Sequence, residues 1–183
     1  MKFEPLEIDG SWIATSDVHV DTRGYFFEWL RTDEFCAKTK ENFEVTQANV
    51  SVSKKYSLRG IHFSSAPSGQ AKWVSCLAGS VLDVIVDLRK DSRTYLKWSQ
   101  INLHAGSGKS LYIGNGLGHA FLALEDNTVV SYLLNTPYQP ELEHSINPFD
   151  TTIGIDWPKG LHTLSQKDAN APSLREWETT HGK

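Results

Sequence analysis

Several side chains in the sequence have the chemistry of acid–base catalysts or anion ligands. His62 lies between two apolar residues in the strand-like segment LRGIHF, and a buried imidazole must either be satisfied by hydrogen bonds or act on a substrate. His62 could serve as a base and Tyr132 as an acid, while Lys72 could stabilise a developing oxyanion. Two arginines are suited to bind phosphate, Arg23 and Arg59. Taken alone, each of these residues is better explained by a structural role, as a bonded core residue or a surface charge.

Metal binding and covalent catalysis have weak support. The seven histidines form neither an HxH nor an HExxH pair, and the two cysteines form no CxxC motif. A GxSxG nucleophile motif is absent, and GSGKS (106–110) lacks the spacing of a phosphate-binding P-loop and is typical of a turn. We therefore expect neither a metal nor a cofactor.

The composition limits the classes of partner. The net charge of -4 over 183 residues argues against binding to nucleic acid or to an anionic membrane surface, because both need a concentrated positive field. No window approaches 18 uncharged apolar residues, and the first residues do not read as a secretion signal. We expect a soluble, cytoplasmic protein whose local basic residues could still hold a small anion.

The elements that must position these side chains are mainly β-strands. Alternating polar and apolar residues, separated by turn residues, predict an all-β sandwich or barrel in one domain (1–183) with its core at about 44–135. A short helix is expected at 32–40 with Thr32 as its cap, and the polar tail from Pro158 onward is expected to wrap around the core. The predicted strands are 44–53, 57–65, 71–77, 80–89, 97–105, 109–114, 119–125 and 127–134.

One face of several strands is repeatedly polar. Alternate side chains of a strand point to opposite faces, and the polar positions on one face are Gln47, Asn49, Ser51, Lys72, Asp83 and Asp87. A barrel that holds a polar ligand inside would give this pattern, and so would a sandwich whose polar face is hydrated. The pattern alone leaves both interpretations open.

The spacing of Arg59 and His62 does not fit a regular strand that directs both side chains into one pocket. They are three positions apart, so a regular strand would send their side chains to opposite faces. Gly60 lies between them, and a glycine in a strand often marks a bulge that redirects a side chain. We expect a local distortion at Gly60 that lets both side chains face one pocket.

Several separated motifs, in order along nearly the whole chain, resemble one family. They are DTRGYFFEWL (21–30), QANVSVS (47–53), LRGIHF (58–63), GQAKWVSCLAGSVLDVIVDLR (69–89), GLGHAFLALED (116–126), Tyr132, Tyr138, EH (143–144), IDWP (155–158) and LSQKDANAP (164–172). The sequence resembles the dTDP-4-dehydrorhamnose 3,5-epimerases, cupin-type proteins of nucleotide-sugar metabolism, and is most similar to actinobacterial members.

The resemblance implies a cupin-type jelly-roll β-barrel with short peripheral helices and a sugar nucleotide in its mouth. The protein would be a homodimer that exchanges N-terminal strands. His62 would be the catalytic base, with Asp168 as its orienting partner. Tyr132 would be the acid on the opposite face of the sugar, and Lys72 would stabilise the enolate oxygen. The substrate-binding positions would be Arg23, Glu28, Gln47, Asn49, Arg59, His119, Tyr138, Glu143 and Lys167.

Within this resemblance, Arg23 and Glu28 would reach across from the neighbouring subunit, and Tyr138 would stack on thymine. The implied reaction is epimerisation of dTDP-4-keto-6-deoxyglucose at C3 and C5 through an enolate, with no metal or cofactor. The chain departs from many members at GNGLGHAF (114–121), where a proline is missing and alanine follows His119. Epimerisation at C3 only or at C5 only, 3,4-ketoisomerisation, and sugar-nucleotide binding without turnover stay open as alternatives.

Overall fold

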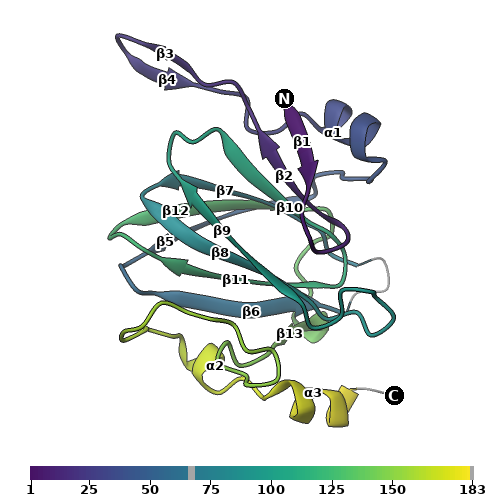
Figure 1. Cartoon of the computed structure of the whole chain (residues 1–183). Coiled ribbons are helices and arrows are strands. Elements are labelled where there is room, and N and C mark those ends of the chain that lie inside the picture. The colour runs from purple at the N-terminus through teal and green to yellow at the C-terminus, as the bar shows by residue number, and fades with distance from the viewer. Residues whose placement is uncertain (66–68, 182–183) are drawn as a thin grey trace.

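The computed structural model describes residues 1–65 and 69–181 of the chain as a sandwich of two antiparallel sheets (Figure 1). The first sheet has the strand order β1 (Lys2–Pro5), β2 (Ser11–Thr15), β10 (Lys109–Ile113), β7 (Lys72–Ala78), β12 (Thr128–Leu134) and β5 (Gln47–Ser53). The second has the order β13 (Glu143–Ser145), β6 (Leu58–Ser64), β11 (Leu117–Ala123), β8 (Ser80–Asp87) and β9 (Trp98–His104). The all-β prediction is confirmed.

Short elements surround the sandwich. They are the hairpin of β3 (His19–Asp21) and β4 (Gly24–Phe26), helix α1 (Thr32–Thr39), the 3₁₀ turn η1 (Pro140–Leu142), and helices α2 (Gln166–Ala169) and α3 (Leu174–His181). The hairpin extends away from both sheets, whereas α2 and α3 lie beneath β6 (Figure 1). None of the helices in the described residues is long and apolar enough to cross a membrane.

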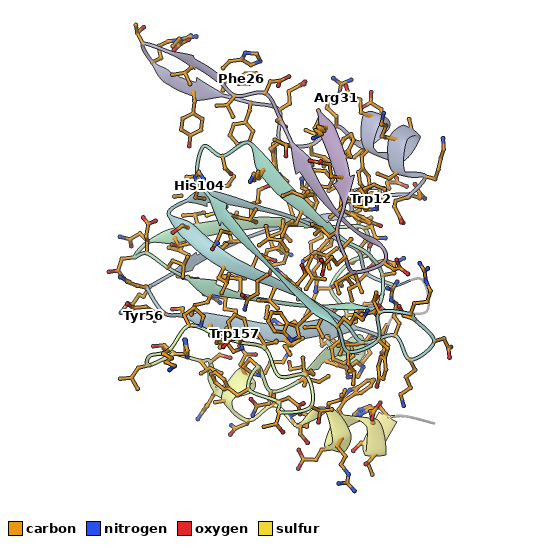
Figure 2. The ribbon with its side chains drawn as sticks, viewed as in Figure 1. Trp12, Phe26, Arg31, Tyr56, His104 and Trp157 are labelled. Carbon is orange, nitrogen blue, oxygen red and sulfur yellow. The ribbon has the colours of Figure 1, made fainter. Side chains whose placement is uncertain are left out.

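Three apolar clusters hold these layers together. Val74, Ile85 and Phe121 belong to the cluster between the two sheets. A second cluster lies between the C-terminal segment and the face of the second sheet that points away from the first sheet. Trp157 of this segment is labelled below β6 in Figure 2. In the third, Phe35 of α1 packs against the first sheet. The interior strand β8 is buried on both faces, which explains its nearly continuous apolar sequence VLDVIV.

The predicted helix forms, but its cap was predicted wrongly. Arg31 is the N-cap residue, it makes no side-chain cap hydrogen bond, and Thr32 is the first helical residue. Packing of Phe35 against Trp73 and Tyr112 therefore stabilises this helix more than capping does.

The C-terminal tail packs against the second sheet. Its backbone meets the second sheet where Leu58 N donates to Thr163 O at 2.9 Å, next to an isolated bridge between Ser57 and Thr163. Helix α2 follows directly and packs against β6. This route brings the residues after Ser165 to the edge of the strand that carries His62.

Candidate active site

A pocket of about 450 Å³ opens between the two sheets. Residues predicted from the sequence that line it are Gln47, Asn49, Arg59, His62, Lys72, His119, Tyr132, Tyr138, Glu143 and Lys167. Ser51, Gln70, Phe121, Leu134 and His144 complete the lining. A polar pocket at this place supports the ligand-holding interpretation of the polar strand face over the merely hydrated one.

Strand register explains this convergence. In β5 the half-buried Gln47, Asn49 and Ser51 alternate with exposed residues, so their side chains share one face. Asn49 pairs with Tyr132 on β12, which belongs to the same sheet. On the opposing sheet His62 of β6 pairs with His119 of β11. The pocket therefore has His62 on one wall and Tyr132 on the other.

His62 is held by a buried carboxylate. His62 Nε2 lies 2.6 Å from Asp168 Oδ1, although 106 positions separate the two residues. Asp168 also accepts a hydrogen bond from the backbone N–H of Gly60, and Ser165 accepts one from the Asp168 N–H at 3.1 Å. Burial alone would raise the pKa of Asp168, but the hydrogen bonds that its carboxylate accepts, of which the one with His62 has the largest effect, hold it below its usual value. An ionised Asp168 accepts from Nε2–H, which leaves Nδ1 of a neutral His62 free to take a proton.

The expected distortion at Gly60 is present. The register between β6 and β11 shifts between the pairs His119–His62 and Phe121–Arg59. Gly60 has a φ of 115°, and a Cβ atom built there would lie 2.5 Å from the carbonyl oxygen of His119. Only glycine fits this position, and the shift lets both Arg59 and His62 line the pocket.

Lys72 is the buried cation of the pocket. Its side chain is only 6% exposed, and Nζ donates to the carbonyl oxygen of His62 at 3.2 Å. Burial lowers the pKa of Lys72 to about 8, although the carboxylates of Glu143 and Asp83 oppose this shift. Near neutral pH the side chain is therefore an ammonium ion, placed next to the strand that carries His62.

Tyr132 supplies a neutral phenol to the opposite wall. Burial raises its pKa, and the nearby Arg59 opposes the shift only in part. The hydroxyl therefore stays protonated at neutral pH and can donate a proton to a bound group.

Two polar partners were missed as site residues. Asp83 is fully buried and lies 2.9 Å from His119 Nε2, so it orients that imidazole as Asp168 orients His62. Gln70 Nε2 donates to Glu143 Oε1 at 2.8 Å. The parity of β8 did mark Asp83 as facing the polar side, but its partner lies on another strand. Gln70 lies two positions before Lys72, so in a strand both side chains lie on the same face. This spacing is the feature of the sequence that could have identified Gln70.

Arg23 and Glu28 lie outside this pocket in the described chain. Arg23 is on the β3–β4 hairpin and pairs with Asp21, with 2.6 Å between Nη2 and Oδ2. The Glu28 carboxylate lies 3.6 Å from Arg31 Nη1. Their assignment to substrate binding stays a prediction that depends on a second subunit.

In the part of the chain that the structure describes, no three His, Cys, Asp or Glu side chains come together as a metal site. Each pocket histidine has a carboxylate partner or a hydroxyl partner instead, as His144 Nε2 shows at 2.8 Å from Ser65 Oγ. The arrangement offers a base, a phenol and an ammonium ion around one polar space.

A sequence model of the family described as dTDP-4-dehydrorhamnose 3,5-epimerase matches residues 5–176. The chain belongs to this epimerase family. The dTDP-4-dehydrorhamnose 3,5-epimerase of Mycobacterium tuberculosis H37Rv is 43% identical over 179 residues, which cover 96% of this chain and 89% of that protein. Epimerisation in dTDP-sugar metabolism, on a cupin fold, is thus the general activity of the chain.

Solved structures of family members agree with the fold. The rmlC epimerase of Mycobacterium tuberculosis superposes with a TM-score of 0.94 at 42% identity, covering 98% of this chain and 92% of that one. The 3'-monoepimerase ChmJ of Streptomyces bikiniensis, solved in complex with dTDP-quinovose, gives 0.92 at 41% identity, covering 96% and 89%. Epimerases of both kinds are therefore similar to this chain to nearly the same degree.

Proposed function

We propose that the protein epimerises dTDP-4-keto-6-deoxyglucose at both C3 and C5, giving dTDP-4-keto-L-rhamnose without a metal or cofactor. The observation that carries the proposal is the convergence of His62, Lys72 and Tyr132 on one pocket, with a buried carboxylate behind His62. A 4-keto group acidifies the hydrogens on its two neighbouring carbons, so this set of groups meets the needs of the reaction.

His62 is the base in this mechanism. Nδ1 removes a proton from C3 or C5, and Asp168 stabilises the imidazolium that forms. The electron pair of the broken C–H bond moves into the enolate, whose negative charge lies on O4. Lys72 is the ammonium ion that stabilises this oxygen in a site where burial strengthens the attraction.

Tyr132 is the acid that completes the inversion. His62 belongs to β6 and Tyr132 to β12, and these strands lie in opposing sheets. A sugar ring bound between the sheets therefore has the base on one face and the phenol on the other. Proton removal from one face and return to the opposite face inverts the carbon centre.

The outer part of the pocket suits the nucleotide. Arg59 and Lys167 supply positive charge for the two phosphates, and the Arg59 guanidinium is oriented by Ser53 Oγ at 3.1 Å from Nε. Tyr138 is half exposed at the rim, where its ring can stack on thymine. Gln47 Oε1 accepts from the Tyr138 N–H at 2.8 Å and holds this residue in place.

Solvent exchange tests the reaction. The protein incubated with dTDP-4-keto-6-deoxyglucose in D2O is expected to place deuterium at both C3 and C5 and to give the rhamno product, as followed by NMR. No deuterium at either carbon would exclude epimerisation and leave a binding protein. In the Tyr132→Phe variant, label should still enter the substrate, because the base remains, while inversion is lost.

Epimerisation at C3 alone is the second candidate, favoured by the nearly equal similarity to a 3'-monoepimerase. Deuterium confined to C3 in the same experiment would establish it. A 3,4-ketoisomerase would be recognised by a product whose carbonyl has moved to C3.

We further propose that the protein acts as a homodimer. The β3–β4 hairpin extends from the sandwich, with Phe26 on it in Figure 2, and exposes Val20 (78%) and Phe26 (67%). Val50 and Val52 are also exposed on the outer face of β5. A second copy of the chain would cover this apolar surface and bring Arg23 to the pocket of its partner, where the positive charge would meet a phosphate.

Complementation tests the dimer. The mass in solution should be about twice that of the 20.5 kDa chain. A heterodimer of one Arg23→Ala chain and one His62→Asn chain has one pocket with both native residues, so it should recover about half the wild-type activity. A heterodimer as inactive as its parents would show that Arg23 does not act across the interface, and a monomeric mass would refute the dimer.

A further inference from the structure

Gln70 is a buried side chain that the mechanism above does not use. It directly precedes the alanine before β7, is only 6% exposed and lines the pocket. Gln70 Nε2 donates to Glu143 Oε1 at 2.8 Å. A glutamine so fully buried and so directly bonded to a carboxylate restricts where that carboxylate can lie.

Glu143 needs such a restraint. It begins β13, a strand of three residues at the edge of the second sheet. Pairing with Ser64 fixes its backbone, but a glutamate side chain has three further rotatable bonds and lies only partly buried here. The hydrogen bond from Gln70 selects the rotamer that points into the pocket.

This rotamer directs the Glu143 carboxylate into the pocket that Lys72 lines. Gln70 and Lys72 are two positions apart, and both line the pocket. The carboxylates that act on the charge of Lys72 are Glu143 on β13 and Asp83 on β8. The other titratable residues that line the pocket with Lys72 are His62, Arg59, His119, Tyr132, Tyr138, His144 and Lys167. Of the two carboxylates, Asp83 is bonded to His119, whereas Glu143 is bonded to Gln70. Gln70 therefore determines the position of Glu143.

We propose that Gln70 is a positioning residue that holds the Glu143 carboxylate inside the pocket that Lys72 also lines, so that its negative charge stabilises the Lys72 ammonium ion. Burial disfavours the charged form of Lys72, and Glu143 opposes that effect more than Asp83 does. Without Gln70 the Glu143 side chain can turn to solvent at the pocket mouth, and Lys72 then loses its proton at lower pH. The consequence for catalysis rests on the proposed role of Lys72, whereas the electrostatic coupling does not.

The titration of Lys72 tests this coupling without turnover. In protein carrying ¹³C-labelled lysine, the Cε signal of Lys72, assigned by its loss in Lys72→Arg, reports the charge of the amine. In Gln70→Met, which keeps the volume and removes the donor, the midpoint should fall by about half to one pH unit. Gln100→Met removes a glutamine that donates to Asp156 O outside the pocket, and its midpoint should equal that of the wild type.

A double-mutant cycle shows whether Gln70 acts through Glu143. Glu143→Gln should lower the midpoint alone, and adding Gln70→Met should change it no further. Equal midpoints in wild type and Gln70→Met, or additive shifts in the double variant, would overturn the proposal. Gln70→Leu is the second variant should the first fail to fold. Absence of solvent exchange in the wild type would instead overturn the epimerase and leave this result intact.

Discussion

Replacing His62 with asparagine should abolish deuterium exchange at both C3 and C5 and lower kcat/KM for dTDP-4-keto-6-deoxyglucose by about 10³-fold. The asparagine amide can still hydrogen-bond to Asp168, 2.6 Å from His62 Nε2 in the native pocket, but it cannot take a proton from carbon. Because one base serves both carbons, label should disappear from both at once. The check is NMR of the substrate recovered from D2O.

A matched control separates this effect from a general loss of structure. His104 lies at the end of β9, where its Nδ1 contacts Ala105 O outside the pocket, so His104→Asn should exchange label at the wild-type rate. Binding of dTDP to His62→Asn, measured by calorimetry, should stay within a few-fold of wild type. Normal exchange in His62→Asn would remove His62 from the role of base.

Strands with one polar and one apolar set of side chains could be predicted from the sequence. In β5 the polar Gln47 and Asn49 alternate with Ala48 and Val50, and a period of two is visible over seven residues. Two very short edge strands lack this signal. β1 has four residues and β13 has three, so both depend on pairing with longer neighbours that the local sequence does not reveal.

The candidate site could likewise be predicted only in part from the sequence. Parity placed Lys72 and Asp83 on the polar face, and the distortion at Gly60 followed from the spacing of Arg59 and His62. The partners of the two histidines lie 36 and 106 positions away, so they depend on strand register and on the route of the tail. Only the family resemblance connected Asp168 to His62 in advance.

Lys72→Met should lower kcat/KM by about 10² to 10³-fold near pH 7, because it removes the charge that stabilises the enolate oxygen. Methionine retains the length and the apolar stem, so the pocket keeps its packing. Lys109→Met is the matched control, since Lys109 is an exposed residue of β10, outside the pocket lining. It should leave kcat/KM unchanged.

The pH profile of the wild type shows in which direction kcat/KM changes when Lys72 loses its proton. With its pKa lowered to about 8 by burial, Lys72 is charged below this pH and neutral above it, so kcat/KM should fall as pH rises through about 8. Lys72→Met has no proton to lose there and should show no such decline. A decline at the same pH in Lys72→Met would assign it to another group, and nearly full activity in this variant would show that enolate charge is stabilised elsewhere in the pocket. The Lys72 ammonium ion is expected to determine both kcat/KM near pH 7 and its decline at higher pH. Lys72→Met should therefore change both measurements together.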